Sequence, residues 1–330
     1  MEKLTAKIPD ICRAEWDAMI NFDFMSAFQP GMKAQMKEWK EHILMPTFPS
    51  EGIEYAYDNW TPQEKDVLIA SFPRTGTNWT TEIVRQILYG HDEDLLEMAG
   101  SVPLPLMLFE GGTASKFKIY DNLPLPRRCA ASHLPATLIN VERFKKANAK
   151  IICVLRNPKD QALSWFNFAP KLPYMHLEPV NQWIKCDWPE FFENYTSGKM
   201  PMGMKNGQWY LDHILTWYPH RDDKNVMFIY YEDMKRDLVA AIRRISSFLN
   251  VELGEKRVLK IAEKCGFIEM KTATENELGE AEKIRKALGV LHKGTVGAWK
   301  ERFTVAQSEA IDEQVEKKLS TTDIKFTYEL

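Results

Sequence analysis

The stretch from residue 67 to residue 90 carries side chains that could bind an oxyanion. A guanidinium, two hydroxyls, an amide and a glycine stand in one short loop, at Arg74, Thr75, Gly76, Thr77 and Asn78. The N-terminus of a helix offers unpaired N–H groups and the positive end of the dipole, which attract phosphate or sulfate. The alternative is an ordinary loop between a strand and a helix. We favour the anion site, because arginine adds a planar and permanently charged donor.

The elements around this loop follow from the spacing of apolar residues. Residues 67–69 form a short apolar run that is typical of a buried strand. Trp79, Ile83 and Ile87 recur at helical spacing, and Gly90 is a plausible stop for that helix. The loop is not a Walker A loop, because the first glycine and the Gly-Lys-Ser/Thr ending are both missing.

A second strand–loop–helix unit places another arginine at a strand end. Arg156 follows the apolar run 151–155, and Ser164 lies eight residues later in the next helical pattern. The guanidinium could pair bidentately with a phosphate, and the hydroxyl could donate to the same group. The alternative is a surface arginine and a helix serine. Ligands of open α/β sheets bind at the carboxyl ends of the strands, so we expect Arg74 and Arg156 to converge on a phosphorylated ligand.

His133 is the candidate general base. It stands at the end of a run of small residues, 129–132, and is followed by Leu134 and Pro135. Most isolated histidines are structural or exposed. A histidine at a strand end that faces an anion site is a better candidate, since its unperturbed pKa lies near neutrality.

A third unit, with a strand at 226–230 and helical spacing from Leu238 to Leu249, completes the pattern. Alternating buried strands and helices predict a single α/β domain with a central parallel sheet flanked by helices. Residues 67–330 form the main body in this interpretation. Residues 1–66 form a partly helical lead-in of the same domain. Its segment 45–60, with Pro46 and Pro49, is interpreted as a surface loop that could act as a lid.

Composition narrows the class of protein. The chain of 330 residues has a net charge of −3, which argues against a general nucleic-acid or membrane-surface role. No apolar run is long enough to span a bilayer. The five cysteines are odd in number and lack metal-ligand spacing, which indicates reduced thiols, no metal site and a cytoplasmic protein.

From about Val67 onward, the motifs resemble those of the cytosolic sulfotransferase family. Six segments match the family's in the same order: 72–79, 133–135, 156–160 with Ser164, 209–210, 267–270 and 292–300. The resemblance implies a P-loop-like phosphosulfate loop and sulfuryl transfer from 3′-phosphoadenosine 5′-phosphosulfate to a small-molecule acceptor, without a metal. It implies catalytic roles for His133, as general base, and for Arg74.

The resemblance also assigns the donor-binding and dimer-forming residues. The expected donor-binding residues are Arg74, Thr75, Gly76, Thr77, Asn78, Trp79, Arg156, Ser164, Tyr210, Cys265, Phe267, Met270, His292, Lys293 and Gly294. A homodimer is expected through a motif formed by Lys300, Thr304, Val305 and Glu309.

The chain departs from the family pattern at four positions. Arg74 and Ala131 replace lysines, Cys265 replaces a threonine and His292 replaces an arginine. Two other functions stay open. One is a nucleotide-binding protein that has lost turnover, to which Arg74 and Ala131 give weight; the other is a phosphotransferase such as a nucleotide kinase, which shares the sheet and loop but needs the missing Walker A lysine. The acceptor is not named by the sequence, although many Phe, Met and Trp residues favour flat apolar alcohols, phenols or sterols over sugars.

Overall fold

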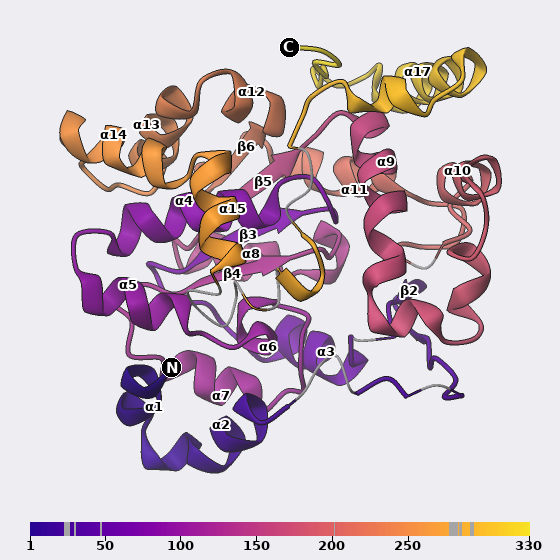
Figure 1. The fold of residues 1–330 in the computed structure, drawn as a ribbon. Coiled ribbons are helices and arrows are strands. Elements are labelled where there is room, and N and C mark those ends of the chain that lie inside the picture. Colours follow the sequence, from indigo (N-terminus) through magenta and orange to yellow (C-terminus); the bar gives the residue numbers. More distant parts are fainter. Residues whose placement is uncertain are drawn as a thin grey trace.

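The computed structural model describes residues 1–330 except 23–26, 30, 47, 201, 277–282, 284–285 and 291–293. Its centre is a parallel sheet of four strands in the order β4-β3-β5-β6 (Figure 1). These strands are β3 (Val67–Ser71), β4 (Cys129–Ser132), β5 (Lys150–Leu155) and β6 (Val226–Tyr230). Ala70 pairs with Ser132 of β4 and with Cys153 of β5, so the three strands end side by side.

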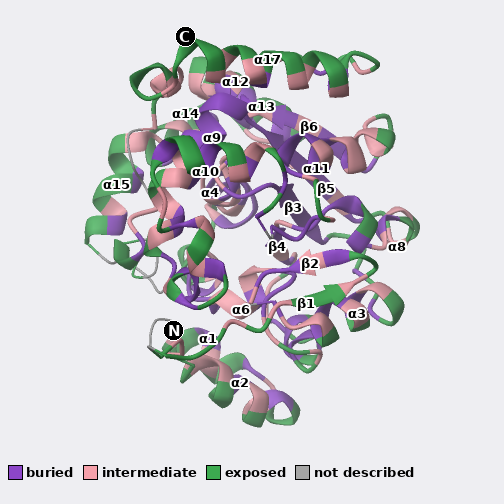
Figure 2. Cartoon of the chain, turned by 90° about the vertical axis from the view of Figure 1, so that its right-hand side faces the viewer, coloured by how far each residue is buried: buried purple, intermediate pink, exposed green. Residues whose placement is uncertain are grey.

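Helices cover both faces of the sheet, which explains why its strands are apolar on both sides. One apolar cluster joins Ile69 and Ile152 to α4 (Thr77–Tyr89), α13 (Leu238–Phe248) and α14 (Glu255–Lys264). The opposite cluster joins Leu68 and Ile151 to α8 (Val141–Lys146), α9 (Pro158–Phe168) and α11 (Tyr210–Trp217). Figure 2 shows β3 and β5 as buried strands at the centre, whereas α17 (Val305–Leu319) is largely exposed.

The other elements are short and surround this core. A two-stranded antiparallel sheet consists of β1 (Lys37–Trp39) and β2 (His42–Leu44). The remaining α-helices are α1 (Glu2–Lys7), α2 (Arg13–Ile20), α3 (Ser50–Asp58), α5 (Glu93–Gly100), α6 (Leu104–Met107), α7 (Lys116–Asp121), α10 (Trp188–Thr196), α12 (Tyr231–Arg236) and α15 (Phe267–Glu275). In the described part of the chain, none of the helices has the length and apolar character needed to cross a membrane.

The predicted α/β architecture with a central parallel sheet is confirmed. The strand predicted at 226–230 has those bounds, and α4 ends before Gly90 as expected. The prediction of a loop over 45–60 is wrong for most of the segment, because Ser50–Asp58 is a helix. Ile53 and Ala56 are buried one helical turn apart, and Pro49 precedes the helix rather than interrupting it. The two prolines were interpreted as loop signals, and the helical spacing of the apolar residues after them was therefore overlooked.

Candidate active site at the carboxyl ends of the strands

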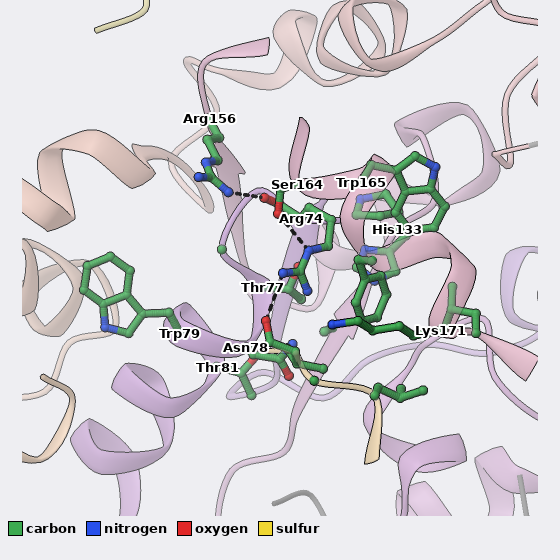
Figure 3. Close-up of a pocket in the computed structure, with 18 of the residues that line it drawn as sticks. Arg74, Thr77, Asn78, Trp79, Thr81, His133, Arg156, Ser164, Trp165 and Lys171 are labelled. Atoms are coloured by element: carbon green, nitrogen blue, oxygen red, sulfur yellow. Dashed lines mark hydrogen bonds between the residues drawn. The ribbon is translucent and has the colours of Figure 1, made fainter. Parts of the chain in front are cut away.

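A cavity of about 360 Å³ opens where β3, β4 and β5 end. It brings together three predicted side chains, each from the segment that follows one of these strands: Arg74, His133 and Arg156 (Figure 3). Arg74 and Arg156 line the same cavity, and Arg156 Nη1 donates to the backbone carbonyl of Arg74 at 3.1 Å. The phosphorylated ligand on which they are expected to converge stays a prediction. Phe22, Met45 and Phe48 bring the N-terminal segment to the cavity wall.

The loop before α4 is held in a conformation that leaves the helix N-terminus facing the cavity. Arg74 and Gly76 have positive φ values of 71° and 117°. A Cβ on Gly76 would lie 2.9 Å from the ring of Tyr231, so only glycine fits there. Gly76 caps α4 without a side-chain hydrogen bond, and the Ser71 and Thr77 hydroxyls bond to each other at 2.7 Å. The first N–H groups of α4 are therefore placed to meet an anion.

Arg74 is bound to the protein on two sides. Its Nε donates to Ser164 Oγ at 3.1 Å and its Nη2 donates to the carbonyl of Val290 at 2.9 Å. Its guanidinium also lies over the ring of Phe168, 4.3 Å from the centroid. Burial and the charge of Arg156 lower the pKa of Arg74 to about 10. The guanidinium therefore remains charged near neutral pH.

Arg156 is anchored through its backbone and leaves a polar atom without a partner. The hydroxyl of Tyr210 accepts from the N–H of Arg156 at 2.9 Å and donates to its carbonyl at 2.8 Å. Its guanidinium lies over Tyr231, but its buried Nε has no hydrogen-bond partner. Within the described ranges, neither Arg74 nor Arg156 pairs with a carboxylate. The cavity wall therefore carries two positive charges that have no ion-pair partner among the described residues, which suits an anion site.

His133 is oriented by the end of β3. Its Nδ1 lies 2.8 Å from the carbonyl of Ser71, which can only accept, so Nδ1 carries the proton and Nε2 is the basic nitrogen. The backbone N–H of His133 donates to Glu110 Oε1, and Ser132 Oγ donates to Glu110 Oε2, both at 2.7 Å. Glu110 thus fixes the backbone on which the imidazole stands.

A second histidine supports the same turn from behind. His213 of α11 donates from Nε2 to the carbonyl of Leu134 at 3.1 Å, and Trp217 donates to the same carbonyl at 3.3 Å. Burial lowers the pKa of His213 to about 3, so this imidazole is neutral near pH 7. The spacing of apolar residues in the sequence predicts that His213 lies on an amphipathic helix, but it does not predict the hydrogen bond to Leu134.

Aromatic residues form the opposite end of the cavity. Trp79 donates from Nε1 to the carbonyl of Cys265 at 2.9 Å and meets Tyr231 edge-on, with the centroids 5.3 Å apart. Phe267 and Met270 line the same cavity. Gly294 has a φ of 61°, and a Cβ there would lie 2.8 Å from the ring of Phe267.

Some predicted residues do not line the cavity. Thr75 is buried and donates to the carbonyl of Phe72, Tyr210 lies behind Arg156, and Cys265 contributes its carbonyl to Trp79. His292 and Lys293 lie outside the described residues.

Sequence reasoning also missed Glu110, Lys171 and Phe168. Phe168 could have been found, because it lies four residues after Ser164 on α9 and therefore on the same face.

The fold and the site define an α/β protein with a cavity that is lined by two arginines and a histidine. A family model described as the sulfotransferase domain matches residues 64–323. The chain is 34% identical to the amine sulfotransferase of Oryctolagus cuniculus over 282 residues, which cover 83% of this chain and 87% of that protein. It is 31% identical to sulfotransferase 6B1 of Mus musculus over 310 residues, covering 89% and 94% respectively.

Solved structures agree with this assignment. The crystal structure of mouse sulfotransferase SULT7A1 complexed with PAP superposes with a TM-score of 0.69 at 29% identity, covering 87% of this chain and 96% of that one. Retinol dehydratase in complex with androsterone and inactive cofactor PAP shares the fold, with a TM-score of 0.68 at 22% identity over 94% and 96% of the two chains. The chain belongs to the sulfotransferase family, and it is a sulfotransferase.

Proposed function

We propose that this enzyme transfers the sulfuryl group of 3′-phosphoadenosine 5′-phosphosulfate to a hydroxyl or amine of a small, largely apolar acceptor. The observation that carries the proposal is the arrangement of Arg74, Arg156 and His133 in one cavity. Two arginines without a carboxylate partner in the described chain fit a donor with phosphates at two positions. The mouse SULT7A1 complex with PAP supports the same donor class.

The donor would lie between the α4 loop and the aromatic end of the cavity. Arg156, Ser164 and Gly294 are proposed to hold the 3′-phosphate, and the unpartnered Nε of Arg156 supports this role. Thr77, Asn78 and the N-terminus of α4 would hold the 5′-phosphosulfate, with Thr75 bracing the loop. Trp79, Phe267 and Met270 would hold the adenine, whereas Tyr210 and Cys265 would act as supports. Contributions from His292 and Lys293, and a reaction without a metal, stay predictions.

The chemistry follows from the charges around the two reacting oxygens. Nε2 of His133 takes the proton of the acceptor hydroxyl as that oxygen forms a bond to sulfur. The bond from sulfur to the bridging oxygen breaks, and its electron pair stays on the departing 5′-phosphate. Arg74 and the N–H groups of α4 stabilise that developing charge. Stabilisation of this kind commonly accelerates a group transfer more than any other single effect.

The experiment that tests this function is a transfer assay with radiolabelled donor and a panel of phenols and alcohols. His133→Ala should lower kcat by about 10²–10⁴-fold, because a general base contributes that much. The affinity of the His133→Ala variant for PAP should stay within about twofold of the parent's affinity, because the imidazole acts on the acceptor. His91→Ala changes an exposed histidine outside the cavity and serves as the matched control.

Two results would count against the proposal. Activity of His133→Ala within a few-fold of the parent would remove His133 from the role of base. A parent that binds PAP but transfers sulfate to none of the acceptors would favour the nucleotide-binding protein without turnover.

A further inference from the structure

The cavity has two chemically different ends. Figure 3 shows Trp79 on one side, whereas His133, Trp165 and Lys171 lie on the other. The proposed base thus marks the end at which the acceptor binds. Trp165 lies at that end (Figure 3), and apolar side chains dominate the lining of the cavity as a whole, among them Leu104, Met107, Leu108, Phe168 and Tyr174.

Lys171 places a positive charge in this apolar wall. It closes the short 3₁₀ turn after α9 (Ala169–Lys171), and its side chain extends toward the middle of the cavity (Figure 3). A Cβ on Gly289 would lie 2.8 Å from Lys171 Nζ, so the ammonium rests against the backbone of Gly289. Across the described residues, no hydrogen-bond acceptor, carboxylate or aromatic ring is a partner of this ammonium.

The carboxylates along the described cavity wall do not neutralise Lys171. They belong to Asp160 and Glu301. The two oxygens of Asp160 accept from the backbone N–H groups of Gly297 and Trp299, and Glu301 already interacts with another group. The acceptor end therefore combines an ammonium that has no partner among the described residues with an apolar surface, and Arg74 adds a second positive charge to the wall of the same cavity.

We propose that Lys171 makes this enzyme select acceptors that carry an anionic group, such as a carboxylate, on the apolar body that bears the hydroxyl. This inference rests on the proposed sulfuryl transfer and names the acceptor class. A carboxylate gains a charge-assisted hydrogen bond from Lys171. A cationic amine at the same place is repelled by Lys171 and Arg74.

Three phenols that differ in the charge of one side chain test the proposal. They are p-hydroxyphenylpropanoate, p-propylphenol and tyramine, which are anionic, neutral and cationic near pH 7. The parent should prefer the anionic phenol over the neutral one by about three- to tenfold in kcat/KM, and tyramine should be the poorest substrate. A NaCl concentration of about 0.5 M should reduce the preference by screening.

Substitution of the lysine should change the order. Lys171→Met should bring the anionic and neutral phenols within about twofold of each other, and Lys171→Glu should favour tyramine over the propanoate. Lys199→Glu makes the same charge change at an exposed lysine that does not line the cavity, and it should keep the parent's order. Binding of the three phenols to the PAP complex, measured by calorimetry, should follow the same order.

Calorimetry separates this inference from the proposed function. If the parent binds the three phenols in the expected order but transfers no sulfate, the proposed reaction is wrong and the proposed selectivity stands. A parent that binds or turns over the neutral phenol as well as the propanoate would overturn the role of Lys171. An unchanged preference in Lys171→Met would do the same.

Discussion

Arg74 takes the place of a lysine in the family's loop, and the structure shows what the exchange changes. A guanidinium can donate to Ser164 and to the carbonyl of Val290 at once, whereas an ammonium is a compact point charge on a flexible stem. These two bonds and the contact with Phe168 orient the guanidinium, so its delocalised charge is not directed at a single oxygen of the donor. The positive charge of the loop is therefore shared among more contacts with the protein than the ammonium of a lysine would make.

We expect Arg74→Lys to preserve or raise the rate of sulfate transfer and Arg74→Ala to lower it by roughly 100-fold. The magnitude is that of one donor removed from a developing oxyanion. Single-turnover rates at saturating donor isolate the chemical step from product release. Arg243→Ala, on the exposed face of α13, is the control. If Arg74→Ala transfers sulfate as fast as the parent, the N–H groups of α4 alone must stabilise the leaving group.

His213 predicts how stability depends on pH. Its pKa is about 3 in the folded protein and about 6.5 when unfolded, so between these values only the unfolded chain binds the proton. The free energy of unfolding should therefore fall as the pH drops from about 6.5 toward 3. His213→Gln keeps an N–H for the carbonyl of Leu134 but does not titrate.

Urea unfolding at about pH 7.5 and pH 4.5 measures this effect. The parent should lose about 3 kcal/mol more than His213→Gln between the two pH values, at roughly 1.4 kcal/mol for each of the two pH units below the unfolded pKa. His91→Gln, at an exposed site, should lose as much as the parent. Equal losses in the parent and in His213→Gln would show that another group controls the acid sensitivity.

The site residues that could be predicted from the sequence are those that directly follow the strands of the sheet. Arg74, His133 and Arg156 each closely follow an apolar run, so the parallel sheet brings them to one edge. Lys171 and Glu110 could not be found in this way. They reach the site from irregular segments, and side-chain direction there depends on tertiary packing. Tyr210 shows the same limit, because it was expected to bind the donor, but it does not line the cavity and its hydroxyl bonds to the backbone of Arg156.

At the scale of elements, the first turn of α9 joins two distant parts of the chain. Asp160 accepts from the N–H groups of Gly297 at 2.8 Å and Trp299 at 2.9 Å. Lys159 donates to Ser308 and Asp312 at 2.7 Å. The family motif at 156–160 thus combines one arginine in the cavity wall with two residues that fix the segment after Gly294.

Asp160→Asn should loosen this segment. An amide oxygen can still accept one N–H, but the second amide position is a donor and cannot. We expect faster hydrogen exchange at Gly297 and Trp299 and roughly tenfold weaker binding of PAP, since a hydrogen bond to a charged group contributes about 1.5–3 kcal/mol. Asp312→Asn, in the exposed partner of Lys159, should change neither. Unchanged exchange in Asp160→Asn would show that other contacts hold the segment.

Regular spacing made the strands of the central sheet and the long helices beside them predictable, and local proline signals caused the error in α3. The helix at 238–248 shows apolar residues at every third or fourth position, and Leu238, Ile242 and Ile245 follow it. In α3 only Ile53 and Ala56 are buried apolar positions, so the pattern is too short to outweigh Pro46 and Pro49. Gly52 of this helix lies against the backbone of Gly112, where a Cβ would come within 2.6 Å of the carbonyl oxygen, and such a contact is not visible in the local sequence.

For the whole molecule, the predicted homodimer depends on the start of α17. Val305 is 75% exposed, and Thr304 caps the helix through a reciprocal bond with Gln307. Sedimentation velocity should show a dimer at micromolar concentration, and Val305→Glu should give monomers that still transfer sulfate. Ile268→Glu changes an equally exposed apolar residue outside the motif and should stay dimeric. A parent that sediments as a monomer at every accessible concentration would contradict the assembly.

The bonds around α9 also have a consequence for how the chain is made. Asn157 Nδ2 donates to the carbonyl of Thr327 at 3.4 Å, across 170 residues of sequence. A ribosome that adds about 5–20 residues per second needs roughly 10–30 s for that interval. During this time all four strands of the central sheet can pair, while Asn157 and Asp160 lack their later partners. Asn157 and Asp160 therefore acquire these partners only late, after the segments around Gly297 and Thr327 have left the ribosome.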